Sequence, residues 1–348
     1  MKPMKKVKPS QLKSILTEVA INGRLPVMVW GAPGIGKSQI VRETAAGLGM
    51  NILDLRLNYY EETDFLGIPI RTERGMEFIK YSRFPRSGRG IWFLDEITHA
   101  RTSTQGLVFQ LINDGMIEDY TVPEGWRYFV GSSNLPSHRS ISNTMPSGLS
   151  SRFTGGHYEL IPDVDDWAEW AIASAVDERI ISFVTYMEHN DQRPWLFRQE
   201  NDYPLTPRTW ATGVNYAVRN LKGEARDIAI MGMIGEDNGL EFLHYLKLAA
   251  DMPDPMKIIE GQYEWLNGNH DPSLWYLLAG SIARVASQDR GRITGCLRAL
   301  LHMKDEYAAL GFSLMRKAVE KEALASNEFL ASNIGKFREI MGVSGAES

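Results

Sequence analysis

Short apolar runs recur through the first half of the chain at spacings that predict strands. The runs at 25–30 and 91–94 are continuous and end at glycine or at acids, which is typical of strands buried on both faces of a parallel sheet. Residues 52–57 alternate polar and apolar side chains with the period of a strand. Two further strands are predicted at 127–131 and 157–161.

Segments with helical spacing of apolar residues separate these strands. They lie at 11–21, 38–48 and 101–113, where apolar residues cluster on one helical face. Strands that alternate with helices predict a parallel sheet between two helical layers. The expected fold class is therefore α/β, an αβα sandwich with a parallel sheet. The basic stretch 1–10 in front of it is expected to be a loose arm.

After Pro162 the pattern changes to helices alone, with a break at Gly232–Gly239. Helices are predicted at 166–175, 178–189, 207–221, 240–250, 255–260, 272–286, 292–303, 306–324 and 333–341. We therefore expect three parts. An α/β core covers 1–161, a small helical lid covers 162–225, and an all-α C-terminal extension covers 226–348.

Composition narrows the class of protein without fixing its activity. The 348 residues suit two or three domains, and the net charge of −5 argues mildly against a general nucleic-acid binder, although a local basic patch could exist. The single cysteine, Cys296, excludes a disulfide within the chain and fits a reducing compartment. The longest apolar runs, such as Trp275–Gly280, are too short to cross a bilayer. We expect a soluble cytoplasmic protein with no membrane insertion.

A phosphate-binding motif follows the first of these strands. The sequence from Gly31 to Ser38 fits G-x-x-x-x-G-K-[ST], with a strand before it and a helix after it, as the motif requires. Backbone N–H groups of such a loop surround phosphate oxygens, the lysine reaches the β- and γ-phosphates, and the hydroxyl binds Mg²⁺. A tight glycine turn that binds nothing is the alternative. The residues expected to contact nucleotide are Gly31, Ala32, Pro33, Gly34, Ile35, Gly36, Lys37, Ser38 and Gln39.

Two acids end the buried strand at 91–94. Asp95 and Glu96 would lie at the carboxyl edge of the sheet, where open α/β sheets bind ligands. Asp95 is expected to hold Mg²⁺ together with Ser38, and Glu96 to orient and deprotonate an attacking water. The alternative is that the two acids only cap the next helix.

Other nucleotide-binding classes lack their signatures here. The sequence has no Asn-Lys-x-Asp guanine box and no Leu-Ser-Gly-Gly-Gln signature, and a small-molecule kinase has no need of a water-activating glutamate. The remaining pattern predicts an enzyme that binds a nucleoside triphosphate with Mg²⁺ and hydrolyses it.

These motifs together resemble the AAA+ ATPases, most closely the MoxR-like branch. The stretch 60–69 looks like the segment before the family's helix-2 insertion, and 92–100 looks like its Walker B block, with Thr98-His99-Ala100 where Asn-Arg-Ala often follows. Residues 130–136 resemble the sensor 1 strand, although Leu135 intervenes between Asn134 and Pro136. The preference for ATP over GTP rests on this resemblance alone.

The resemblance also implies roles for single residues. Asn134 would position the attacking water, Arg152 would act as an arginine finger on a neighbouring subunit's nucleotide, and Arg208 would act as sensor 2 within its own subunit. The alternatives are a turn asparagine, a surface ion-pair arginine and a helix-surface arginine. Arg101 and Arg139 are further candidates to face the neighbouring nucleotide. His99 has no partner that the sequence identifies.

Finally, the resemblance implies a biological setting. The subunits would form a homo-hexameric ring that remodels or activates a protein partner in a chaperone-like way, beside a protein with a von Willebrand factor A-type domain. Two alternatives stay open: a nucleic-acid-associated motor or restriction-type NTPase of the same superfamily, and a nucleotide-switched assembly protein. Whether the protein binds nucleic acid is left open by the sequence.

Overall fold

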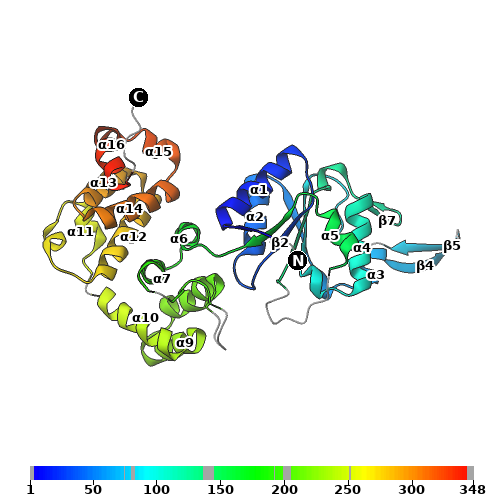
Figure 1. Cartoon of the computed structure of the whole chain (residues 1–348), viewed down its shortest axis with the longest axis horizontal. Helices are drawn as coiled ribbons and strands as arrows, with labels where there is room; N and C mark the ends of the chain where they lie inside the picture. The colour runs from blue at the N-terminus through cyan, green and yellow to red at the C-terminus, as the bar shows by residue number, and fades with distance from the viewer. Residues whose placement is uncertain are drawn as a thin grey trace. The chain divides into compact units, whose positions relative to one another are not determined.

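Two compact units, Met1–Pro162 and Asp163–Ser348, make up the chain in the computed structural model (Figure 1). The structure describes residues 4–73, 75–79, 83–135, 145–191, 193–198, 205–250 and 252–342. The first unit contains the sheet, and the second unit is helical throughout its regular elements.

A parallel sheet forms the centre of the first unit. Within the described residues it has six strands in the order β1-β10-β2-β9-β6-β3, and every neighbouring pair is parallel. The strands are β1 (Lys5–Val7), β2 (Val27–Trp30), β3 (Asn51–Arg56), β6 (Gly90–Asp95), β9 (Phe129–Ser133) and β10 (His157–Leu160). All residues of β2, β6 and β9 are buried, as expected for central strands covered on both faces. The predicted α/β fold class is confirmed.

The start of the chain is part of this sheet, and the prediction of a loose arm was wrong. Lys5 to Val7 pair with Tyr158 to Leu160 of β10 and so form an edge strand. Val7 is buried while Lys5 and Lys6 are exposed, because this short strand presents one apolar side chain to the core between charged neighbours. The strand was not predicted from the sequence, because two of its three residues are lysines.

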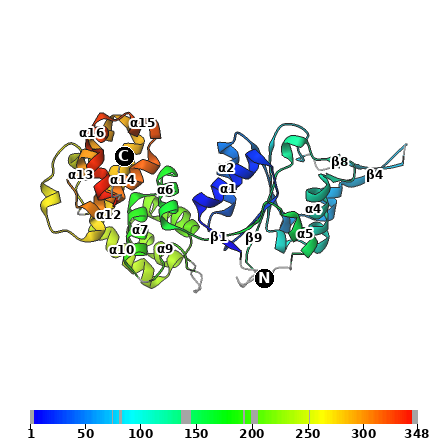
Figure 2. The same cartoon turned by 45° about the horizontal axis from the view of Figure 1, so that its top comes forward.

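Helices cover both faces of the sheet. Helices α1 (Pro9–Asn22) and α2 (Lys37–Gly47) lie against one face, and α4 (Thr102–Asp114) and α5 (Ser147–Arg152) lie against the other (Figures 1 and 2). On the α4 side, large apolar side chains of the strands form a core that includes Met28, Trp30, Leu53, Trp92 and Leu94. The sheet is therefore a rigid base on which the loops at its carboxyl edge are held.

Two hairpins extend this unit. Helix α3 (Glu62–Leu66) leads into the antiparallel pair β4 (Ile68–Thr72) and β5 (Gly75–Ile79), which projects from the sandwich (Figure 1). Helix α4 ends at Gly115, whose φ of 65° requires the left-handed region, and β7 (Met116–Ile117) and β8 (Tyr120–Thr121) follow.

The second unit consists of helices in its regular elements. In the described residues they are α6 (Val164–Ala173), α7 (Glu178–Asn190), a π-helix (Thr209–Val214), α8 (Asn215–Asn220), α9 (Gly223–Ile234), α10 (Glu236–Ala249), α11 (Pro255–Ile259), α12 (Pro272–Gln288), α13 (Ile293–Leu301), α14 (Asp305–Ala318), α15 (Lys321–Ala325) and α16 (Glu328–Ile340), with short 3₁₀ helices at Glu264–Asn267 and Arg290–Arg292.

Two details of the second unit differ from the pattern-based prediction. Helix α9 occupies much of the stretch that was not assigned, and the chain turns only at Gly235, whose φ is 86°. The long helix predicted at 306–324 is two helices, because backbone at Val319 and Glu320 is extended. The predicted break at Gly232–Gly239 therefore contains the turn but is too long, whereas the break at Val319 and Glu320 was not predicted.

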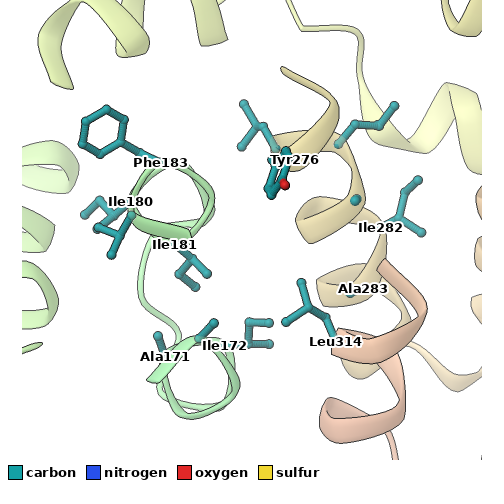
Figure 3. Packing of buried hydrophobic residues seen from close by; sticks show 14 of the residues in the cluster. Ala171, Ile172, Ile180, Ile181, Phe183, Tyr276, Ile282, Ala283 and Leu314 are labelled. Atoms are coloured by element: carbon teal, nitrogen blue, oxygen red, sulfur yellow. The ribbon is translucent and has the colours of Figure 1, made fainter. Parts of the chain in front are cut away.

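A single apolar core holds the second unit together. It runs from Trp167 in α6 to Phe337 in α16, so residues on both sides of position 225 contribute to it. Figure 3 shows side chains of α6, α7, α12 and α14 that pack there. In the described part of the chain, no helix combines the length and the apolar character needed to cross a membrane.

Candidate functional site

The loop between β2 and α2 has the backbone shape of a phosphate cradle. Gly34 and Gly36 have φ values of 80° and 102°, a region that L-residues with a side chain rarely adopt. A Cβ on Gly31 would lie 2.5 Å from Cδ1 of Ile35, so this position has no room for a side chain. Helix α2 starts at Lys37, which leaves its first N–H groups directed toward the loop.

Lys37 is held inside this loop. Its Nζ donates to the carbonyl oxygens of Gly31 at 2.7 Å and Ala32 at 3.1 Å, and to Oδ1 of Asn134 at 3.2 Å. The lysine is 7% exposed, so these acceptors replace water around a buried charge. The structure thus brings together Lys37 and Asn134, which lie 97 positions apart in the sequence.

Asp95 links the loop to the neighbouring strand. Oγ of Ser38 donates to Oδ2 of Asp95 at 3.3 Å, while Oδ1 accepts from the Ser132 hydroxyl and from the N–H of Glu96 at 3.0 Å. Asp95 is 8% exposed. Every carboxylate oxygen therefore has a donor, and the carboxylate faces the first turn of α2.

Ser132 is a site residue that the sequence analysis missed. Strand β9 pairs with β6 so that Leu94 is opposite Gly131, which places the next residues, Asp95 and Ser132, side by side at the strand ends. Side chains alternate along a strand, so Ser132 and Asn134 point to the same side of β9. That alternation was a usable signal, because Asn134 was already a candidate.

Glu96 leaves the strand in an unusual conformation. Its φ of 58° is left-handed, and a short 3₁₀ turn, Ile97–His99, begins directly after it. The turn is fixed to β9, because the Thr98 N–H donates to Oγ of Ser133 at 3.3 Å and the two hydroxyls also bond. The backbone thus directs the Glu96 side chain away from Asp95 and toward its own turn.

Within that turn, Glu96 contacts His99. Oε2 of Glu96 lies 2.7 Å from Nδ1 of His99. The angle is poor for a hydrogen bond, and neither atom has another hydrogen-bond partner in the part of the chain that the structure describes. The structure thus shows a contact partner for His99, for which the sequence identified none.

The acids suit a magnesium ion that keeps most of its water. Among the described residues, no group of three or more His, Cys, Asp or Glu side chains comes close enough to hold a metal alone. Mg²⁺ in nucleotide sites commonly takes one or two protein oxygens and completes its shell with water and phosphate oxygens. The adjacent oxygens of Ser38 and Asp95 fit that donor set.

Arg152 lies at the last turn of α5 and stacks on an aromatic ring. Its Cζ is 4.8 Å from the ring centre of Phe109 on α4, and its Nη1 is 3.4 Å from Oγ of Ser151. Its Nε has no hydrogen-bond partner among the described residues. Within the described residues, the contact that orients this side chain is therefore the cation–π contact with Phe109.

Of the remaining candidate arginines, the structure describes Arg101 and Arg208. Nη2 of Arg101 pairs with Oε1 of Glu61 at 2.8 Å, and both side chains are largely exposed. Arg208 belongs to the second unit, where it is exposed and directly precedes the π-helix. Arg139 lies outside the described residues.

The geometry of the first unit agrees with a family match. Residues 26–153 match the family model of the AAA domain, dynein-related subfamily. The matched AAA segment starts one residue before β2 and ends one residue after Arg152, so it includes the whole cluster described above. It places this part of the chain in the AAA+ ATPase superfamily and confirms that broader prediction. The MoxR-like branch stays a prediction.

Solved structures resemble the chain only distantly. NtrX from Brucella abortus in complex with ADP is 15% identical, with 89% of this chain and 68% of that chain covered and a TM-score of 0.42. The RuvB Holliday junction branch migration motor of Thermotoga maritima is 18% identical, with 79% and 80% covered and a TM-score of 0.38. At these values the likeness carries no information on the function of this chain. No curated protein matches the chain significantly.

Proposed function

We propose that this protein is an ATP- and Mg²⁺-dependent ATPase. One observation supports this most strongly: the Asp95 carboxylate is bonded to the Ser38 hydroxyl of the glycine loop, and Glu96 follows it directly. A metal-binding acid beside the phosphate loop, with a second acid next to it, is the arrangement that nucleotide hydrolysis requires. A glycine turn that binds no ligand would not need an acid pair beside it.

The loop residues 31–39 would bind the phosphates. Main-chain N–H groups from Gly34 to Ser38 and the N-terminus of α2 would supply donors and partial positive charge. Lys37 would exchange its bonds to loop carbonyls for bonds to the β- and γ-phosphate oxygens, with Asn134 still beside it. Because the ammonium is already desolvated, little reorganisation is needed at the moment of binding.

The acids and Asn134 would carry out the chemistry. Ser38 and Asp95 would hold Mg²⁺, which when bound neutralises charge on the phosphate oxygens. Glu96 would accept a proton from the attacking water, and the Asn134 amide would orient that water. Ser132 would act by holding Asp95 in place through its hydroxyl.

Two arginines would complete the site by charge stabilisation. We propose that Arg152 contacts the γ-phosphate bound by a neighbouring subunit, because its guanidinium is stacked on Phe109 without an acidic partner in the structure described. Arg208 is proposed to contact phosphate within its own subunit, as part of a lid formed by 162–225. Such an arrangement implies a ring, and we propose a homo-hexamer.

We propose that ATP hydrolysis drives the remodelling or activation of a protein partner in the cytoplasm, as in MoxR-like ATPases. A protein with a von Willebrand factor A-type domain would act beside it. The C-terminal extension 226–348 would present the surface for such a partner. A pull-down with the Glu96→Gln protein in ATP tests this, because a hydrolysis-blocked remodeller retains its client. Stimulation of hydrolysis by DNA, declining steeply with salt, would instead indicate a nucleic-acid motor.

The central experiment measures ATP binding and hydrolysis with magnesium present. Glu96→Gln is expected to bind ATP normally and to lose at least about 10²-fold in turnover, because a positioned base contributes about 10² to 10⁴. Lys37→Ala is expected to lose nucleotide binding. Glu124→Gln, an exposed acid outside the site, is the control and should change neither. Normal hydrolysis by both site variants would contradict the proposal.

A further inference from the structure

A chain of hydrogen bonds runs from the strand before the glycine loop to the helix that carries Arg152. Nε1 of Trp30 donates to Nδ1 of His157 at 3.1 Å, and Nε2 of His157 lies 2.9 Å from the carbonyl oxygen of Ser150. Trp30 is the last residue of β2, His157 is the first residue of β10, and Ser150 lies in α5. We refer to these three residues as the Trp30 relay.

The partners of the imidazole fix its protonation. An indole N–H only donates, so Nδ1 of His157 must be the acceptor. A carbonyl only accepts, so Nε2 must carry the proton and donate to Ser150. The ring is therefore the neutral Nε2–H tautomer, as assigned from the network of bonds. Both ring nitrogens of His157 are therefore engaged in hydrogen bonds, one to Trp30 and one to Ser150.

The relay also packs tightly at both ends. Trp30 is 3% exposed, so its N–H would be buried without a partner if His157 were absent. The rings of Trp30 and His157 are stacked, with centres 6.2 Å apart, and Phe153 meets His157 edge-on at 5.9 Å. The imidazole is therefore held between the strand on one side and the end of α5 on the other.

The two ends of the relay adjoin the two halves of the proposed catalytic machinery. The residue after Trp30 is Gly31, whose carbonyl accepts from Lys37 and whose N–H donates to Ser133 at 3.1 Å. Ser150 is two positions before Arg152, in the same short helix. A shift of the loop on phosphate binding thus has a bonded route to the helix that positions the arginine.

We propose that His157 is a positioning residue that couples the occupancy of the glycine loop to the placement of Arg152. This inference rests on the proposed function and specifies its regulation: each subunit's own phosphate site adjusts the arginine that it offers to a second copy of this chain. His157 contacts neither nucleotide nor water in this role. It acts through α5, so its loss should affect turnover that depends on Arg152 and leave nucleotide affinity intact.

The test combines His157→Ala with Arg152→Ala in the full chain. Turnover at saturating ATP and the affinity for labelled ADP are measured for wild type, both single variants and the double variant. His157→Ala is expected to lower turnover about three- to tenfold, the range of one lost hydrogen bond in a positioned network. In the Arg152→Ala background it should cause no further loss, since coupled residues are not additive. ADP affinity should stay within about twofold of wild type.

Two milder variants keep the test informative if His157→Ala fails to fold. Trp30→Phe removes the indole N–H together with part of the ring system, keeps an aromatic side chain, and should lower turnover in the same Arg152-dependent way. His157→Gln keeps an amide acceptor and donor on a side chain of similar reach, and it should recover about half or more of the lost turnover. Far-ultraviolet circular dichroism shows whether each variant is folded.

Four results would overturn the proposal: equal losses of turnover with and without Arg152, a loss of ADP affinity in place of turnover, unchanged turnover in all relay variants, or turnover that does not depend on Arg152 at all. Failure of the proposed function looks different, because the wild-type protein itself would then not hydrolyse ATP.

Discussion

Oε2 of Glu96 lies 2.7 Å from Nδ1 of His99, three positions further along the chain. The contact depends on the left-handed backbone at Glu96, which turns the chain back on itself directly after β6. The proposed base is therefore in contact with a residue of its own turn.

His99→Ala is expected to lower turnover several-fold, about threefold to tenfold, because the Glu96 carboxylate loses the group that orients it. His99→Asn is the matched control, since its amide can reach the position of Nδ1 and should retain most of the turnover. Steady-state hydrolysis at saturating ATP measures both. Equal activity of wild type and His99→Ala would show that the contact has no role in orientation.

Ser132→Ala is expected to raise the Mg²⁺ concentration needed for half-maximal hydrolysis by about tenfold. The variant removes a hydrogen bond to the buried Asp95 carboxylate, and bonds to charged groups contribute about 1.5–3 kcal/mol. A magnesium titration at fixed ATP measures the shift. Ser133→Ala is the control: it removes the neighbouring hydroxyl, which bonds Thr98, and should leave the magnesium requirement unchanged.

Phe109→Leu is expected to lower turnover about two- to fivefold, because a cation–π contact between half-buried side chains is worth at least about 0.5–1 kcal/mol. The change keeps an apolar side chain on α4 but removes the ring on which the Arg152 guanidinium lies. In the Arg152→Ala protein the same change should have no effect on turnover. An equal loss in both proteins would assign Phe109 to the packing of α4 alone.

Cys296 is expected to resist thiol reagents in the folded protein. It is fully buried in the core of the second unit, and burial raises the pKa of its thiol to about 12. The thiolate, which is the reactive form, is therefore scarce at neutral pH, and its share grows only as the pH approaches that value. Labelling with iodoacetamide at pH 8 should require denaturant, and rapid labelling of the native protein would contradict the described core.

The candidate cluster was largely predictable because its residues occupy fixed places relative to strand ends. A glycine loop after a buried strand and two acids after another strand must meet at the carboxyl edge of a parallel sheet. The structure brings Lys37, Ser38, Asp95 and Asn134 together at that edge. Local sequence patterns were therefore enough to predict this cluster, because the parallel sheet places the ends of its strands at one edge.

The α/β class, the loop at Gly31–Ser38 and the acids that follow β6 could be predicted from local patterns, because each depends on short-range periodicity or on a motif of adjacent residues. The folded chain was needed to show that Lys5–Val7 is an edge strand, that Ser132 bonds Asp95, and that Trp30 and His157 are hydrogen-bonded. Those contacts join residues far apart in the chain. Their partners are set by strand order and register, which no local pattern specifies.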